Sequence, residues 1–192
     1  HITEEIIENP KIKYLDLKLG NICNLKCRIC GTHSSSKWIA EQKHYDKQDN
    51  RDDEHVRHSW PETNKDFWQQ LEELLPTLEY IDFTGGEPFM IKDQFELLKF
   101  CVDKGYAKNI GIHYNTNGTQ LPNDALQNIW PHFKTVDVQF SIDGIGEQFE
   151  YQRHPAKWDR AVEILQAFKD KQSKKFTVGI CHTINIFNVM YL

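Results

Sequence analysis

The sequence predicts an α/β fold in which helices cover one parallel sheet. Short segments with an apolar residue at every second position indicate strands, and longer segments with apolar residues at helical spacing indicate helices. The two kinds of segment alternate along the chain, which is typical of right-handed βαβ units around a parallel sheet. A length of 192 residues suits one domain, so we expect a single domain over residues 1–192.

The first part of the chain contains one strand, one helix and one irregular stretch. Leucines alternate with polar residues over 12–19, which predicts the first strand. Three serines beginning at Ser34 can cap a following helix. Residues 42–60 are crowded with polar side chains, and we expect a mobile insertion there. The acidic and histidine residues within 52–58 could bind a metal, but a solvated loop is the favoured interpretation because no regular spacing aligns them.

The rest of the chain alternates regularly. The apolar spacing predicts helices over 61–75, 93–104, 122–130 and 157–170. It predicts further strands over 79–84, 109–115, 135–142 and 175–184. Cys101 lies on the apolar face of its expected helix, so we expect it to pack in the core.

One face of these strands is polar, although strands covered on both sides are usually apolar throughout. A closed eight-stranded barrel fills its interior with branched apolar side chains. The pattern therefore predicts a curved sheet that stays open, with a wet cleft along its polar face. The alternative is that these polar groups satisfy one another. The residues that we expect to contact a substrate are Asp16, Lys18, Asp82, His113, Asp137 and Gln139.

Composition excludes several classes of protein. The net charge is −5 and no basic block is present, which argues against a nucleic-acid partner. No apolar run has membrane-spanning length, so we expect no membrane partner. Three of the five cysteines are clustered, which does not suit a secreted disulfide framework and favours a cytoplasmic location. Both ends of the chain look cut, and we expect a longer protein.

The cluster Cys23, Cys27 and Cys30 follows the first strand and can turn three thiols toward one point. Three thiolates suit a soft metal centre, either zinc or iron–sulfur. His33 could complete a closed Cys₃His site, which would make the protein a structural zinc-binding module.

The loops after the strands carry three motifs at the edge where active sites of parallel sheets lie. They are Cys-x-x-x-Cys-x-x-Cys at 23–30, Gly-Gly-Glu-Pro at 85–88 and Ser-Ile-Asp-Gly at 141–144. Together they resemble the radical S-adenosylmethionine (SAM) superfamily, over nearly the whole chain. The resemblance implies a partial, open (β/α)6 TIM-like barrel. Five of its six strands are recognisable, so we expect the sixth beyond residue 192.

The resemblance also implies the chemistry of the site. In that family three cysteines, here Cys23, Cys27 and Cys30, hold a [4Fe–4S] cluster and leave one iron open to SAM. An electron from the cluster cleaves SAM to a 5′-deoxyadenosyl radical, which abstracts hydrogen from the substrate. Glu87 is expected to shape its loop and could accept a proton from the amine of SAM. The residues expected to bind SAM are Ile29, Gly85, Gly86, Glu87, Pro88, Asn115, Asn117, Ser141, Arg153 and Asn185.

Partners follow from the same resemblance. They are an unidentified peptide or small-molecule substrate and an electron donor such as a flavodoxin or ferredoxin. The family commonly has an aromatic residue where this chain has Ile29, which weakens stacking near adenine. Segments 30–38 and 141–155 resemble the branch that carries a SPASM or twitch extension. The extra cysteines of that extension are absent from this sequence, so we expect them beyond residue 192.

Overall fold

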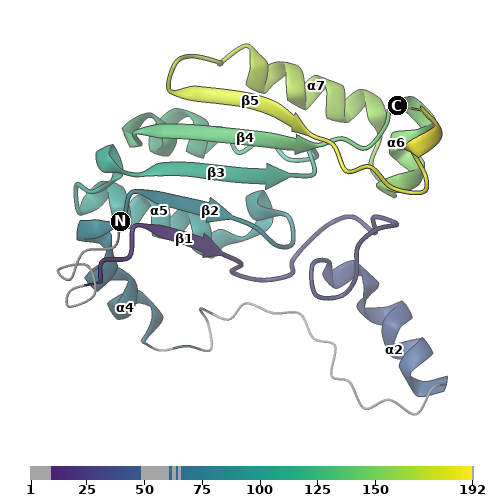
Figure 1. Cartoon of the computed structure of the whole chain (residues 1–192), viewed down its shortest axis with the longest axis horizontal. Coiled ribbons are helices and arrows are strands. Elements are labelled where there is room, and N and C mark those ends of the chain that lie inside the picture. The colour runs from purple at the N-terminus through teal and green to yellow at the C-terminus, as the bar shows by residue number, and fades with distance from the viewer. Residues whose placement is uncertain (1–9, 49–60, 62–63, 65, 192) are drawn as a thin grey trace.

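The computed structural model describes residues 10–48, 61, 64 and 66–191. Its centre is one sheet of five parallel strands arranged in chain order (Figure 1). The strands are β1 (Tyr14–Leu17), β2 (Tyr80–Phe83), β3 (Gly111–Thr116), β4 (Thr135–Ser141) and β5 (Phe176–Cys181). The predicted open α/β fold is therefore confirmed, with strands somewhat shorter than expected.

Helices connect and cover these strands. The α-helices are α2 (Ile39–Gln48), α4 (Phe67–Leu74), α5 (Lys92–Asp103), α6 (Gly146–Gln152) and α7 (Trp158–Lys169). The 3₁₀ turns are η1 (Ser36–Trp38), η2 (Leu75–Thr77), η3 (Pro88–Met90), η4 (Ala107–Asn109), η6 (Trp130–His132) and η7 (Val189–Tyr191). Helix α5 lies behind the strands in Figure 1, whereas α2 and α6 lie beyond the arrowheads, at the carboxyl edge of the sheet.

Two helical elements differ from what the sequence predicts. The helix expected over 122–130 is a π-helical turn, η5 (Ala125–Ile129), followed by η6. Pro131 has no backbone N–H and cannot extend a regular helical ladder through this point. Helix α6 was not expected from the sequence.

The expected insertion at 42–60 begins as regular structure, because α2 continues to Gln48. The remainder, including the candidate metal-binding residues within 52–58, lies outside the described residues. The helix expected over 61–75 is seen as α4 and the following turn η2.

The core lies between the sheet and its covering helices. Tyr114 is at its centre with no exposed surface, and its hydroxyl donates a 2.7 Å hydrogen bond to Gln94 of α5. Its ring stacks on Phe83 of β2 at 5.0 Å between centroids and contacts Phe89 and Trp130. Buried aromatic side chains of this kind contribute much of the apolar stabilisation of a core. The strands pack against this close-packed core, which fixes the positions of their ends.

The other face of the sheet is polar, as predicted. Each strand contributes one residue to a row across the sheet: Asp16, Asp82, His113, Asp137 and Thr177. The side chains in this row bond to neighbours. His113 Nδ1 lies 2.7 Å from Asp137 Oδ2, and Thr177 donates to Asp137 at 2.6 Å. The interpretation that these groups satisfy one another is thus met in part, and a substrate cleft along this face stays a prediction.

Candidate functional site

The cysteine loop leaves β1 at the carboxyl edge of the sheet and is largely buried. Cys23 and Cys27 are 7% and 9% exposed, and Cys30 is half-buried. A loop without regular structure needs partners for its backbone groups when it is buried. Four other segments of the chain contact this loop, through backbone or side-chain groups.

The first of these segments is the serine turn before α2. The Ser35 hydroxyl donates a 2.5 Å hydrogen bond to the carbonyl of Leu25, and it also accepts from the N–H of Lys37 as the cap of η1. The indole N–H of Trp38 donates to the carbonyl of Cys27 at 3.2 Å. The turn therefore fixes the cysteine loop and starts the following helix with the same side chain.

The Gly-Gly-Glu-Pro loop is the second segment. The N–H of Glu87 donates to the carbonyl of Ile22 at 2.7 Å. Gly86 has φ of +57°, and a Cβ there would lie 2.4 Å from that same carbonyl oxygen. Only glycine permits this approach. The sequence pointed to glycine for close approach to a ligand, and the structure shows that Gly86 packs against the cysteine loop itself.

The Glu87 carboxylate faces the protein interior and has no exposed surface. Its oxygens accept hydrogen bonds from the N–H groups of Phe89 and Asn117 and from the Thr116 hydroxyl. Burial raises the pKa of Glu87 from 4.5 to about 7, against the opposing effect of these donors. The carboxylate thus ties its loop to the end of β3, as expected of a residue that shapes the loop, and both of its oxygens are already engaged by the chain.

Asn117, at the end of β3, is the third contact. Its amide nitrogen donates to Asn24 Oδ1 at 2.9 Å and lies 3.7 Å from the sulfur of Cys23. Its side-chain oxygen accepts from both the N–H and the hydroxyl of Thr119. This expected SAM-binding residue therefore lies beside a cysteine and is held there by its neighbours.

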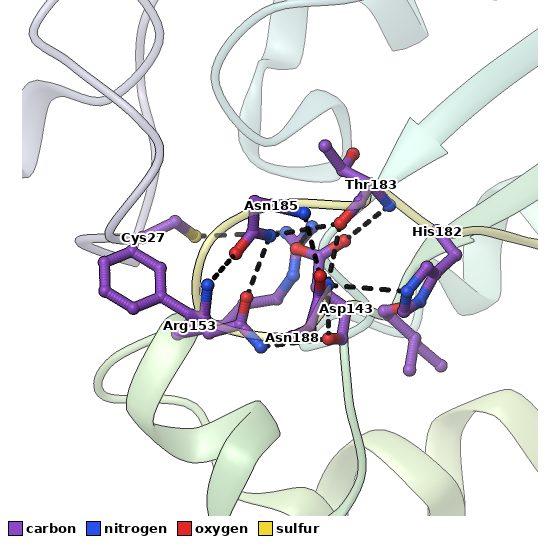
Figure 2. Close-up of polar contacts among 10 residues, drawn as sticks. Cys27, Asp143, Arg153, His182, Thr183, Asn185 and Asn188 are labelled. Atoms are coloured by element: carbon purple, nitrogen blue, oxygen red, sulfur yellow. Dashed lines mark hydrogen bonds and ion pairs between the residues drawn. The ribbon is translucent and has the colours of Figure 1, made fainter. Parts of the chain in front are cut away.

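The end of α6 is the fourth segment. The carbonyls of Gln152 and His154 accept hydrogen bonds from the N–H groups of Arg28 and Lys26, at 2.8 and 2.6 Å. The chain between them presents Arg153, whose Nη1 lies 3.9 Å from the sulfur of Cys27 (Figure 2). The predicted cysteine and the predicted arginine, 126 residues apart, thus meet.

Arg153 is 8% exposed and pairs with Asp143, which is 1% exposed. The distance from Nη2 to Asp143 Oδ2 is 2.5 Å. Its Nε is buried, and no hydrogen-bond partner for it exists within the described part of the chain. A guanidinium with an unpartnered N–H in such a position suits an additional anionic group.

A polar network behind Arg153 was not predicted from the sequence. Asp143 also accepts from the N–H of Thr183 at 2.9 Å, and its backbone carbonyl accepts from the amides of Gln152 and Asn188 (Figure 2). Asn185, an expected SAM contact, donates to Gln152 at 3.0 Å and so belongs to this network. The motif at 141–144 had drawn attention to Asp143, but nothing in the sequence identified its partners.

The other expected SAM contacts are less closely tied to the cysteines. Ile29 is 45% exposed, and Pro88 is buried in η3. Asn115 lies 3.2 Å from the ring of His113, and Ser141 ends β4 half-buried. Gly85 has φ of +75° and packs against the side chain of Lys18.

The chemistry of the donor set fits a metal centre that needs thiolates. Burial raises the pKa of all three thiols, that of Cys27 to about 11, while Arg153 opposes the shift at Cys27. Metal binding displaces such protons and stabilises the thiolates. The buried thiols together with the adjacent cationic side chain therefore fit an anionic iron–sulfur cluster.

The zinc alternative is not favoured. Among the residues that the structure describes, no three His, Cys, Asp or Glu side chains are gathered closely enough to hold a single ion. A single tetrahedral ion draws its ligands to one point, whereas a cubane takes each thiolate on a different iron. His33, the proposed fourth zinc ligand, is exposed.

No helix among the described residues has the length and apolarity to cross a membrane.

Comparisons with known proteins identify a family and relatives for this chain. The family model of the radical SAM superfamily matches residues 17–188. The chain is 24% identical over 133 residues to a 7,8-dihydro-6-hydroxymethylpterin dimethyltransferase of Methanocaldococcus jannaschii, covering 69% of this chain and 22% of that protein.

The fold is similar to that of two solved structures. One is anSMEcpe with bound AdoMet, with a TM-score of 0.59 and 20% identity over 88% of this chain and 42% of that one. The other is native anSMEcpe with bound AdoMet and the Cp18Cys peptide, with a TM-score of 0.56 and 21% identity over 90% of this chain and 43% of that one. The chain spans less than half the length of these relatives.

Proposed function

Because the chain belongs to the radical SAM superfamily, whose enzymes use a [4Fe–4S] cluster and SAM, we propose that Cys23, Cys27 and Cys30 hold that cluster. The observation that carries the proposal is the convergence of separate segments on the cysteine loop. The Gly-Gly-Glu-Pro loop, the end of β3 and the end of α6 all bond directly to it.

The residues of this chain then have distinct roles. When bound, the cluster and SAM supply a reductive cleavage that yields a hydrogen-abstracting radical. Arg153 offers its unpartnered Nε to an anionic group and stabilises the Cys27 thiolate. Asn117 holds the loop around Cys23, and Glu87 keeps Asn117 in position.

We also propose that SAM lies along the carboxyl edge of the sheet. The carbonyls of Gly85 and Gly86 are suited to accept from its amino group. Ser141 and Arg153 are suited to bind its carboxylate. Ile29, Pro88, Asn115 and Asn185 complete the expected set, with Asn185 acting through the network around Asp143.

The remaining assignments concern the whole protein. We propose a peptide or small-molecule substrate, in line with the pterin and the peptide named for the two kinds of relative. The electron donor is a flavodoxin or ferredoxin, and the protein belongs to the branch with a SPASM or twitch extension.

The test is anaerobic reconstitution of the full-length protein with iron and sulfide, followed by reduction with dithionite in the presence of SAM. The wild type should bind about four irons per core site and form 5′-deoxyadenosine. Cys27→Ala should lose both, because a cluster ligand is removed. Cys181→Ala, which changes an exposed cysteine outside the loop, should behave like the wild type. Wild-type protein that binds zinc tightly and forms no 5′-deoxyadenosine would refute the proposal.

A further inference from the structure

The start of the cysteine loop borders a hollow of about 600 Å³. Cys23 lies in its wall, and Ile22, Ile39 and Met90 give it an apolar lining. Cys27, Cys30 and Arg153 do not line it, so this hollow is separate from the arginine side of the site.

The rim of the hollow is positively charged, although the chain as a whole has a net charge of −5. Lys37 of η1 and Lys43 of α2 border it, and both are exposed. Neither has an ion-pair partner within the described residues. The acidic group nearest in sequence, Glu41, is paired with Lys26, which compensates its charge. Within the part of the chain that the structure describes, no acidic side chain pairs with the two rim lysines, so they can attract an acidic surface.

We propose that this hollow is the docking surface of an acidic one-electron donor protein, which seats the apolar edge of its redox cofactor against the lining. The inference rests on the proposed function, which requires such a donor. The donor loses one electron and the cluster gains it, and no atom is transferred. A partner seated here places its cofactor beside Cys23, and its acidic surface meets Lys37 and Lys43.

Charge complementarity of this kind acts mainly on the rate of encounter and on salt dependence. An exposed pair of lysines attracts an acidic partner strongly only when the ionic strength is low, because salt screens the interaction over about 10 Å at 0.1 M. A docking role of the two lysines therefore makes the binding of the donor depend on salt concentration, whereas a purely structural role does not.

The experiment compares the wild type, the double variant Lys37→Glu with Lys43→Glu, and the control Lys169→Glu. Lys169 is an exposed lysine on α7, so its reversal changes the net charge without touching the hollow. The first readout is the binding of an oxidised flavodoxin to the reconstituted protein without reductant, by calorimetry at low and high salt. The double variant should bind about tenfold more weakly at low salt and lose most of the salt dependence, and the control should keep wild-type binding.

The second readout is the rate of cluster reduction. Reduced flavodoxin should reduce the double variant at least about tenfold more slowly than the wild type, while dithionite, a small reductant, should reduce both alike. Unchanged flavodoxin binding in the double variant, or an equal loss in Lys169→Glu, would overturn the docking assignment. A protein that forms no 5′-deoxyadenosine with dithionite would instead show that the proposed function has failed.

Discussion

Buried charges hold the site together at the scale of single residues. Arg153 and Asp143 are each less than one-tenth exposed, and their ion pair is joined to the sulfur of Cys27 on one side and to the segment after β5 on the other. A buried ion pair contributes little net stability, but the loss of one partner leaves the other charge uncompensated. Arg153 thus contacts two different groups, the carboxylate of Asp143 and the thiol of Cys27.

Removing one member of this pair should destabilise the protein strongly. We expect Arg153→Met to lower the free energy of unfolding by about 3–5 kcal/mol, because Asp143 is left as an unpaired buried charge. Adding Asp143→Asn should restore part of that loss, with a coupling of at least about 1 kcal/mol in the double-mutant cycle. Urea unfolding of the wild type, the two single variants and the double variant measures this coupling free energy. Strictly additive effects would contradict the pairing.

Glu87 should make stability depend on pH. Its pKa is raised by burial from 4.5 to about 7, so the folded state binds the proton more tightly than the unfolded state. The resulting stabilisation is complete below pH 4.5 and is lost as the pH rises through 7. Relative to Glu87→Gln, which cannot titrate, the wild type should lose up to about 3 kcal/mol between pH 4.5 and pH 8.

Glu96→Gln provides the control for that comparison, because Glu96 is exposed on α5. The free energy of unfolding of Glu96→Gln should change with pH as that of the wild type does over the same range. A wild type and a Glu87→Gln variant with parallel stability curves would show that folding does not raise the pKa of Glu87.

At the scale of elements, the site is built where loops pack against loops. The Gly-Gly-Glu-Pro loop meets the cysteine loop through one backbone hydrogen bond and through the absence of a side chain at Gly86. Neither contact involves a cysteine, yet both hold Ile22, the residue directly before Cys23. The loops therefore depend on one another for their conformation.

A methyl group at position 86 should separate the two loops. Gly86→Ala is expected to cost at least about 1–2 kcal/mol more than Gly105→Ala, because both glycines have positive φ but only Gly86 also meets a carbonyl oxygen at 2.4 Å. Gly105 has nothing within 4 Å of an added Cβ, so its variant reports the backbone strain alone. Thermal unfolding and iron content after reconstitution measure the difference. Equal losses in the two variants would contradict the close packing.

The sequence predicted the elements that bury one regular apolar face. The five strands and helices α5 and α7 were found from periodicity because their apolar positions pack on one core. Helix α6 escaped prediction because it spans only seven residues, with Phe149 as its buried apolar side chain. The turn at Ala125–Ile129 departs from a regular helix because of local backbone chemistry that apolar spacing does not report.

At the scale of the whole molecule, the strand order explains why distant motifs meet. Parallel strands in chain order place every following loop at the same edge, so positions 23–30, 85–88, 115–118 and 141–144 converge. This convergence could be predicted from the sequence, since it needs only the strand positions and the rule for parallel connections. The motif positions of the candidate site follow from it.

The contacts inside the site could not be predicted in the same way. The direction of the Glu87 carboxylate, toward Thr116 and Asn117 and away from solvent, is decided by which donors lie within reach after folding. Asp143 likewise pairs through its carboxylate with Arg153 and through its backbone carbonyl with the amide of Asn188, which come from distant parts of the chain. Sequence patterns report burial and spacing, and they contain no information on which polar groups pair in the interior.

Electron paramagnetic resonance of the reduced, reconstituted full-length protein, before and after SAM is added, tests most directly whether the three cysteines hold a cluster that binds SAM. The wild type should give the signal of a reduced [4Fe–4S] cluster that changes shape when SAM binds, and Cys27→Ala should give no core-cluster signal. A cluster signal that is the same with and without SAM, or one that survives in Cys27→Ala, would contradict it.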